Sequence, residues 1–568
     1  ARGHRRGSES RAWRVGGLRQ AIGEPDEAVL ERAAARVGLS RAELKWCRLA
    51  KRSVDARGRG ADLHFVVQVD LAAQEGRRSQ KLDRLVKSGK VRPAPPVEGW
   101  AADVGAWPGG AAPHVVVVGA GPGGLFAALS AAESGVRVTL VERGEPIERR
   151  GRKVVAFHRG GQPDPDNNLL FGDGGAGTYS DGKLYTRVSD ALEPAVIAEL
   201  VAAGAPEDIA FDARAHIGTD RLHRMLPRLR TRLQEAGVAF RYGVRVTGLD
   251  WRDAPDGPGR VVRGLQTSEG DIPSDAVVLC IGHSARDTWA RLIEDGVRLD
   301  PKPFQLGVRI EHPQGLITRG RYGEVLGTDT GDVLGPASYN LQSKGAPPAH
   351  SFCMCPGGRI VASVNEPGRL CTNGMSNSKH SSRWANAAMV TTFTPEDFAR
   401  YGFEGPLAGV ELQRCLEERF FMAGGETYAA PAQRASDFVS GEESTGELRT
   451  SYGFGAVPRR VDHLLPPEVR DALREALARF DRTIPGFAGP EGLLVGIETR
   501  SSGPVRMTRD RETRLAMGFG NLYPAGEGAG YAGGIMSAAI DGARSAKAAV
   551  AALAARGVDA GPYGTTPR

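Results

Sequence analysis

A glycine-rich turn between residues 115 and 124 constrains the fold of this chain more than any other feature. Four valines lead into Gly119-Ala-Gly121-Pro-Gly-Gly124, which has the spacing GxGxxG. Apolar residues then recur with helical spacing over residues 125–132, and a second apolar stretch ends at Glu142. This order of strand, glycine turn, helix, strand and acidic residue predicts a dinucleotide-binding βαβ unit.

Each part of this turn has an expected task. Gly119 permits the tight turn, Gly121 lets a pyrophosphate approach the backbone, and Gly124 allows the helix to pack closely on the strand. The first turn of the helix offers N–H groups to the phosphates, and Glu142 is expected to accept a hydrogen bond from a ribose hydroxyl. The turn alone does not distinguish FAD from NAD.

Charge and cysteine content limit where such a protein works. Residues 1–100 hold 22 basic and 12 acidic residues, against a net charge of +7 for all 568, so affinity for an acidic partner is expected only at the N-terminal end. Six cysteines without a CxxC pair favour a reducing cytoplasm over a disulfide framework or a zinc site. The apolar run at residues 115–132 carries no charge but contains Pro122 and several glycines, so no membrane span is expected.

A second glycine-dense segment spans residues 171–184. Within it, Gly177 to Lys183 fits the first seven positions of a nucleoside-triphosphate loop, but Leu184 stands where Mg²⁺ coordination needs Ser or Thr. We therefore favour a second loop around the same dinucleotide, with Ser180 and Lys183 at its polar edge. A tight structural turn without a ligand is the alternative.

A third glycine cluster precedes the last predicted helix. Glu527, between Gly526 and Gly528, is placed to accept hydrogen bonds from sugar-alcohol hydroxyls. Gly533 and Gly534 stand at the start of that helix, where N–H groups can face a polarised carbonyl.

Together these motifs resemble those of bacterial FAD-dependent dehydrogenases, relatives of the glutathione-reductase-like two-dinucleotide-domain flavoproteins. The resemblance covers essentially the whole chain and rests on the glycine turn with Glu142-Arg143-Gly144 and on the segments FGDGGAGTYSDGKLYTR (171–187), CIGHSARDT (280–288), SFCMCPGG (351–358), TNGMS (372–376) and YPAGEGAGYAGGIMSAAIDG (523–542). It implies an α/β fold: a Rossmann-like FAD-binding domain interrupted by an α+β substrate domain, preceded by a small α/β module.

The resemblance also implies which residues bind FAD. These are Gly119, Gly121, Gly124 and Glu142 for the ADP half, Gly177 and Ser180 along the flavin, Gly282 after the third strand, and Gly526, Glu527, Gly528 and Gly533 for ribityl and isoalloxazine. Arg143, Gly175 and Gly534 are further expected cofactor-binding residues. One departure is Gly526-Glu527, where the wider superfamily commonly has Gly-Asp. The extra methylene displaces the carboxylate and changes its expected hydroxyl partner.

Local patterns suggest a domain organisation. Helices are expected at 27–37 and 219–237, and strands at 63–71, 239–249, 260–267 and 275–281, with 239–249 and 260–267 paired. The expected units are a disordered basic tail (1–12), the small module (13–87), a linker (88–113), the FAD-binding domain (114–300 and 490–568) and the inserted substrate domain (301–489).

Catalytic candidates are fewer than cofactor candidates. Lys183 and Arg500 lie in motif-like stretches, and Arg500 is expected to face the flavin ring and anchor an anionic substrate. Cys353 and Cys355 form a CxC pair, for which burial in a strand is the more ordinary interpretation and redox activity the alternative. His283 is more simply a turn residue.

The expected function is transfer of hydride between a small organic substrate and bound FAD. No redox CxxxxC and no second GxGxxG after a strand are present, so NADH or NADPH, where used, is expected to dock transiently. A flavin-dependent monooxygenase is one alternative. A nucleic-acid-associated flavoprotein, binding RNA through the basic module for RNA modification or redox sensing, is an alternative of another class, but a solvated arginine-rich face is the favoured interpretation of that module.

Overall fold

Three bodies of β-structure organise the chain in the computed structural model. It describes residues 12–57, 62–77, 79–104, 107, 112–184, 186, 188–255 and 258–556. The expected basic tail, residues 1–12, lies outside this part of the chain except for Ala12, which begins the first strand.

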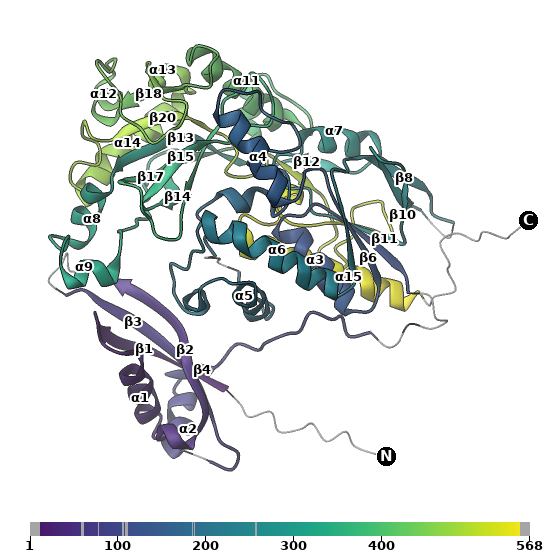
Figure 1. Cartoon of the computed structure of the whole chain (residues 1–568), viewed down its shortest axis with the longest axis vertical. Coiled ribbons are helices and arrows are strands. Elements are labelled where there is room, and N and C mark those ends of the chain that lie inside the picture. Colours follow the sequence, from purple (N-terminus) through teal and green to yellow (C-terminus); the bar gives the residue numbers. More distant parts are fainter. Residues whose placement is uncertain are drawn as a thin grey trace, which may run out of the picture.

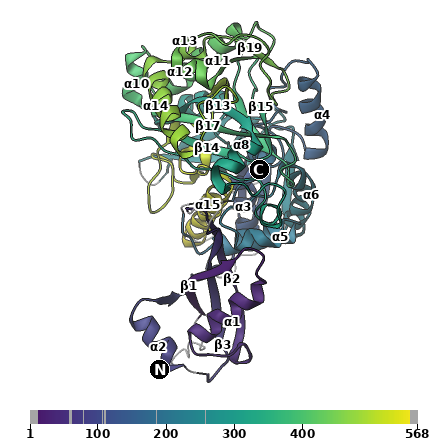
Figure 2. The same cartoon turned by 90° about the vertical axis from the view of Figure 1, so that its left-hand side faces the viewer.

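The N-terminal module is a four-stranded antiparallel sheet with two helices, at the lower end of Figures 1 and 2. Its elements are β1 (Ala12–Ala21), α1 (Asp26–Arg36), β2 (Leu44–Asp55), β3 (His64–Ala73), α2 (Gln80–Lys87) and β4 (Val91–Pro93), in the sheet order β2-β3-β1-β4. The sequence predicted α1 and β3 but not β1, whose pairing with β3 shifts between Val15 and Leu18. This irregularity at Gly16-Gly17 breaks the alternation that marks a strand. The edge of β2 joins the main body where Arg52 and Phe211 share a backbone hydrogen bond.

A five-stranded parallel sheet carries the glycine turn. Its order is β22 (Leu522–Pro524), β11 (Ala276–Leu279), β5 (His114–Val118), β6 (Arg137–Glu142) and β7 (Val238–Tyr242). β22, near the C-terminal end of the chain, thus joins the same sheet as β5, with β11 between the two.

Both faces of this sheet are covered, which explains why β5 is a continuous run of valines. Val115 and Val117 pack against helices α3 (Pro122–Glu133) and α15 (Ile535–Ala555), with α5 (Glu193–Ala202) and α6 (Thr219–Glu235) nearby. Val116 and Val118 instead face α7 (Arg286–Glu294) and the antiparallel strands β8 (Val246–Asp253), β9 (Arg260–Thr267) and β10 (Ile272–Pro273).

The expected strand at 239–249 is wrong as one element. Residues 238–242 form β7 of the parallel sheet, and β8 begins only at Val246 and pairs with β9. Gly243, with a φ of 70°, turns the chain between the two strands.

The third body is a six-stranded sheet in the order β14 (Ala349–Cys355), β17 (Trp384–Phe393), β13 (Phe304–Pro313), β20 (Leu493–Glu498), β18 (Ala430–Arg434) and β19 (Ala456–Pro458). Its helices are α8 (Gln314–Tyr322), α9 (Asp329–Leu334), α10 (Pro395–Arg400), α11 (Ala408–Ala423), α12 (Ala435–Ser440), α13 (Val461–Leu464) and α14 (Pro467–Thr483). Because β20 pairs with β13 and β18, the expected boundary at residue 490 is displaced: this sheet is completed before the chain returns to β22.

Two short antiparallel strand pairs lie outside these larger sheets. β12 (Leu299–Pro301) pairs with β21 (Val505–Met507), and β15 (Gly358–Ala362) pairs with β16 (Thr372–Ser376). Helix α4 (Ile147–His158) follows β6 and lies beside the upper body in Figure 1. Among the described residues, no helix is long and apolar enough to cross a membrane.

Candidate active site

A cavity of about 890 Å³ opens at the carboxyl ends of β5, β6 and β11. Gly119, Glu142 and Gly282 stand just after or at these strand ends, and all three line it. Within the sheet, β6 pairs with β5 on one side and β11 pairs with it on the other, so the strand order reverses at β5. A cavity at such a point is where open parallel sheets bind their ligands, and its volume is at the upper end of the range for small-molecule sites.

The glycine turn has the tight geometry that its spacing predicts. Gly119 has a φ of 101°, and a Cβ there would lie 2.3 Å from the carbonyl oxygen of Cys280. A Cβ on Gly124 would lie 1.7 Å from the carbonyl oxygen of Gly119, so Gly124 serves packing and does not line the cavity. Gly121 is the N-cap of α3 and does line it, so the N–H groups of the first helical turn are available to a phosphate there.

Glu142 is already engaged in a way that the sequence did not predict. Its carboxylate accepts hydrogen bonds from the backbone N–H groups of Ala120 (2.8 Å), Gly144 (2.9 Å) and Gly172 (2.9 Å). A carboxylate offers about four acceptor positions, so roughly one remains for a ribose hydroxyl. Glu142 therefore also ties the glycine turn to the 171–184 segment.

The side chain of Arg143 does not line the cavity, contrary to what the resemblance implied. Its guanidinium bonds to Asp166 (2.7 Å) and Asp287 (2.9 Å) and stacks over the ring of Phe171. These contacts occupy its donors, and they fasten α7 and the 164–171 segment to the end of β6.

The 171–184 segment lies against the glycine turn and lines the same cavity, through Gly175, Gly177 and Ser180 among others. The hydroxyl of Ser180 donates to the carbonyl of Gly177 (2.7 Å) and accepts from the N–H of Gly182. A Cβ on Gly175 would lie 3.0 Å from the Cα of Gly121, so the two glycine segments are in direct contact.

Arg150 holds this wall in place, and sequence reasoning missed it. The fully buried guanidinium donates to the carbonyls of Asn168 (2.9 Å), Asp173 (2.7 Å) and Gly175 (3.0 Å). A signal was present, because Arg150 falls on the apolar stripe of α4 between Ile147 and Val154, where a charged side chain needs a specific partner.

The C-terminal glycine cluster closes the cavity from the other side. Gly526, with a φ of 72°, and Gly533 and Gly534 line it, and no atom lies within 4 Å of a Cβ built on Gly533 or Gly534. Gly534 is the N-cap of α15, so a second helix N-terminus faces the cavity. Gly528 does not line it: a Cβ there would lie 2.5 Å from the carbonyl of Gly282, which makes it a packing residue.

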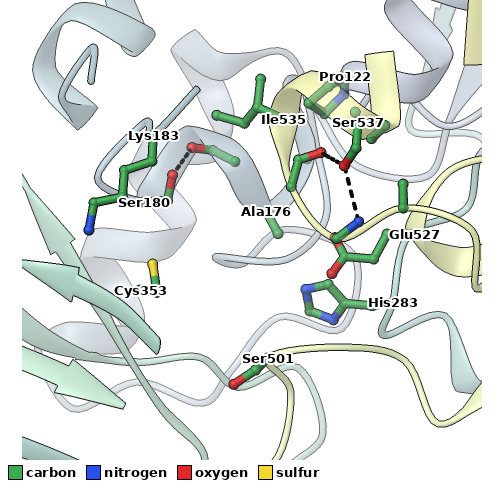
Figure 3. A pocket seen from close by; sticks show the side chains of 18 of the residues that line it. Pro122, Ala176, Ser180, Lys183, His283, Cys353, Ser501, Glu527, Ile535 and Ser537 are labelled. Atoms are coloured by element: carbon green, nitrogen blue, oxygen red, sulfur yellow. Dashed lines mark hydrogen bonds between the residues drawn. The ribbon is translucent and has the colours of Figure 1, made fainter. Parts of the chain in front are cut away.

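Glu527 lies beside His283 on the cavity wall (Figure 3). Burial raises the pKa of Glu527 to about 8; Lys302 opposes this shift and Cys353 adds to it. At neutral pH this carboxyl is therefore mostly protonated and can donate a hydrogen bond. The pKa of His283 is lowered to about 4 by burial and by the charges of Arg500 and Arg286, so its ring is neutral.

Lys183 and Cys353 lie on the opposite wall and both point into the cavity (Figure 3). The Lys183 ammonium lies 3.4 Å from a carboxylate oxygen of Asp181. Burial disfavours its charge, but Asp181 and the two cysteines 353 and 355 outweigh burial and raise its pKa. Lys183 therefore brings a fixed positive charge to the cavity.

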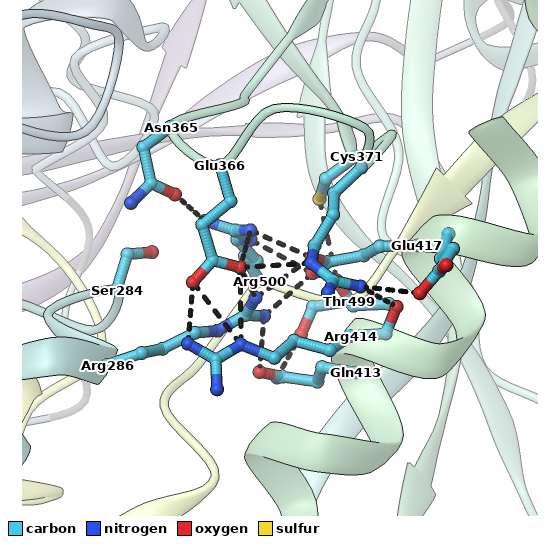
Figure 4. A network of polar contacts seen from close by, with 12 residues as sticks. Ser284, Arg286, Asn365, Glu366, Cys371, Gln413, Arg414, Glu417, Thr499 and Arg500 are labelled. Atoms are coloured by element: carbon cyan, nitrogen blue, oxygen red, sulfur yellow. Dashed lines mark hydrogen bonds and ion pairs between the residues drawn. The ribbon is translucent and has the colours of Figure 1, made fainter. Parts of the chain in front are cut away.

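Arg500 touches the cavity but does not present a free guanidinium to it. Its side chain is 2% exposed and donates to both carboxylate oxygens of Glu417 and to Asn365. Arg286 donates to the same carboxylate from the other side, and Glu366 and Arg414 extend the network (Figure 4). The expected role of Arg500 as a direct anchor is therefore corrected: it is paired within the protein and positions the wall.

The residues of this cavity fit a dinucleotide with a large planar ring. Two helix N-termini, at Gly121 and Gly534, can face phosphate or carbonyl oxygens, and open space lies beside the lining glycines Gly282, Gly533 and Gly534. Glu142 and Glu527 add polar side chains for hydroxyl groups. Fold and site together define the class: an α/β dinucleotide-binding protein whose cavity continues onto a second sheet.

Comparisons with known proteins identify the family. Residues 303–501 match the family described as FAD-dependent protein, C-terminal domain-like, residues 114–147 match FAD dependent oxidoreductase, and residues 17–72 match a domain of unknown function. An uncharacterized protein of Clostridium beijerinckii is 36% identical over 542 residues, which cover 94% of this chain and 98% of that protein. The chain belongs to the FAD-dependent oxidoreductase family and is an oxidoreductase enzyme.

Solved structures resemble the chain more distantly. L-proline dehydrogenase from P. horikoshii has a TM-score of 0.30 at 12% identity, covering 77% of this chain and 93% of that one. Glycine oxidase from Geobacillus kaustophilus has a TM-score of 0.28 at 12% identity, covering 79% and 96%. The assignment to the family rests on the sequence relative and the family matches.

Proposed function

We propose that this enzyme transfers hydride between a small organic substrate and the flavin of bound FAD, in the cavity between the parallel and the six-stranded sheets. One observation carries the proposal: the cavity is continuous from the glycine turn at Gly119 to side chains of the second body, including Asn373, Ser501 and Cys353. A dinucleotide on the first part would leave its reactive ring beside the second part.

The flavin supplies the two-electron chemistry when it is bound, and the chain supplies position and charge. Lys183 attracts an anionic group of the substrate. Neutral His283 and the protonated carboxyl of Glu527 offer hydrogen bonds without adding charge. The wall that carries Ser501 is held by the Arg500–Glu417 ion pair, so substrate groups meet a rigid surface.

NADH or NADPH is proposed as a transient donor. The GxGxxG spacing recurs at residues 172–177 and 528–533, but both segments already line this cavity, so such a donor would have to enter the same cavity and leave again. Hydride transfer to flavin in the open part of one cavity needs no separate nucleotide domain.

The test is anaerobic reduction of the FAD-loaded protein, followed at 450 nm during addition of NADH, then NADPH, then candidate amines and hydroxy acids. Bleaching by a nucleotide supports a nicotinamide-linked enzyme, and bleaching by a substrate alone supports a dehydrogenase. The variant Lys183→Met is expected to raise the KM for an anionic substrate about tenfold or more with flavin content unchanged, whereas exposed Lys344→Met changes neither. Absence of bound flavin after reconstitution with FAD would overturn the proposal.

A further inference from the structure

Two thiols lie together at an irregularity of β14, beside the cavity. The pairing of β14 with β17 shifts between Phe352 and Cys355, and Cys353 has a φ of 43°, in the left-handed region that non-glycine residues seldom adopt. The backbone there departs from simple alternation, so Cys353 and Cys355 lie at a bulge rather than in a regular stretch of strand. The thiol of Cys355 also contacts the carbonyl oxygen of Cys353 at 3.4 Å.

The two cysteines differ in exposure. Cys353 is half-buried and lines the cavity, with its sulfur pointing into it (Figure 3), whereas Cys355 is fully buried behind it. Both are free thiols. One thiol is thus open to the cavity and the second is reachable from the first.

Two cations lie beside this pair, each with a carboxylate partner: Lys183 with Asp181 and Arg309 with Glu498. Lys183 shares the cavity wall with Cys353, and the guanidinium of Arg309 lies 3.1 Å from the carbonyl of Cys353 and 3.8 Å from the sulfur of Cys355. The hydrogen bond from Cys355 lowers the pKa of Cys353; burial opposes this, and the charges of Lys183 and Arg309 lower it further. A thiolate at Cys353 is the nucleophilic form of a cysteine.

We propose that Cys353 and Cys355 are a redox-active dithiol that exchanges two electrons with the flavin and passes them to a small-molecule disulfide. The proposal goes beyond hydride transfer to an organic substrate, and it rests on the proposed position of FAD in this cavity. Strained backbone at Cys353 is consistent with a functional role, because such positions gather at active sites.

The electrons and protons balance. Reduction of the pair would break its S–S bond with two electrons and one proton supplied by reduced FAD, and it would convert Cys355 to a thiol and Cys353 to a thiolate. The Cys353 thiolate then attacks one sulfur of the external disulfide, forms a mixed disulfide and releases the other half as a thiolate. Cys355 resolves the mixed disulfide, which restores the Cys353–Cys355 bond and releases the second half as a thiol.

Counting electrons tests the pair without measuring turnover. The FAD-loaded protein is oxidised with diamide, desalted, and titrated anaerobically with dithionite while flavin absorbance and free thiols are followed. The wild type is expected to take up four electrons per flavin, two for the flavin and two for the disulfide. Cys353→Ser and Cys355→Ser are each expected to take up two, and the control Cys415→Ser, an exposed cysteine on α11, four.

Peptide mass spectrometry of the oxidised wild type under non-reducing conditions should show a Cys353–Cys355 linkage. Uptake of two electrons per flavin by the wild type, without that linkage, would overturn the dithiol and leave the flavin proposal intact. Absence of flavin would instead remove the flavin proposal. Normalising to bound flavin keeps the comparison valid where a serine variant folds in lower yield.

Discussion

Arg500 donates two hydrogen bonds to the carboxylate of Glu417, one from its Nε at 3.0 Å and one from a terminal NH2 group at 2.8 Å. Both side chains are buried. The same two oxygens accept from Arg286 at 2.8 and 2.9 Å. One carboxylate thus pairs with two guanidinium groups behind the cavity wall, and Glu366 supplies a second negative charge beside Arg286. Burial alone would raise the pKa of Glu417, but Arg286 and Arg500 outweigh burial and hold this pKa well below its usual range.

Glu417→Gln should destabilise the protein by about 3–5 kcal/mol, because it removes the counter-charge that two buried guanidinium groups share and leaves Glu366 as their nearest carboxylate. Thermal unfolding is the measurement, with exposed Glu443→Gln as the control. The sign of the pH effect follows from the lowered pKa: the stabilisation by Glu417 is present above its ordinary pKa of 4.5 and is lost as the pH falls below it. An equal midpoint for the two variants at pH 7 would contradict this account.

The variants Gly124→Ala and Gly533→Ala should distinguish a glycine that is needed for packing from a glycine that contacts the bound FAD. The first places a Cβ 1.7 Å from the Gly119 carbonyl and should lower the stability of the flavin-free protein by about 2 kcal/mol or more. The second has open space for its Cβ and should leave that stability within about 0.5 kcal/mol while weakening FAD binding. Thermal unfolding without FAD and fluorescence titration with FAD check the pair. Equal behaviour of the two variants would argue against the assigned roles.

Arg150→Met should loosen the 171–184 wall. Three carbonyls, of Asn168, Asp173 and Gly175, would lose their donor, at about 1–3 kcal/mol for each one left buried and unpaired. The flavin content should fall, with proteolysis beginning within this segment. Arg149→Met is the matched control, because the neighbouring side chain is largely exposed and pairs only with Glu145 among the described residues. The interpretation fails if both variants retain FAD equally.

Glu527 should make stability fall as the pH rises. Its folded-state pKa, raised to about 8 from 4.5 chiefly by burial, means that the folded protein holds a proton that the unfolded chain releases. Between these two values each rise in pH therefore favours unfolding. Glu527→Gln should remove this dependence, so that its melting temperature relative to wild type increases from pH 5 to pH 8 in the flavin-free protein. Parallel profiles would show that Glu527 is charged throughout.

The sequence by itself determined the dinucleotide site. The order of valines, glycines and Glu142 is local, and the tasks of Gly119 and Gly124 follow from backbone geometry within a few residues of each. Local spacing also predicted α1, α3 and β3. Residues 239–249 were predicted as one strand, but they belong to two strands in different sheets. Contacts outside a strand decide which sheet it joins, so the local pattern could not show this division.

Only the tertiary structure decided what the charged side chains do. Arg500, Glu417 and Arg286 come from segments more than 80 residues apart, and nothing in their neighbours along the chain indicates that they meet. Cys353 and Lys183 face the same cavity from segments 170 residues apart. The physical reason is that burial of a charge or a thiol depends on folding the whole chain around it. Its pKa, its partner and its reactivity therefore become defined only when distant segments pack together.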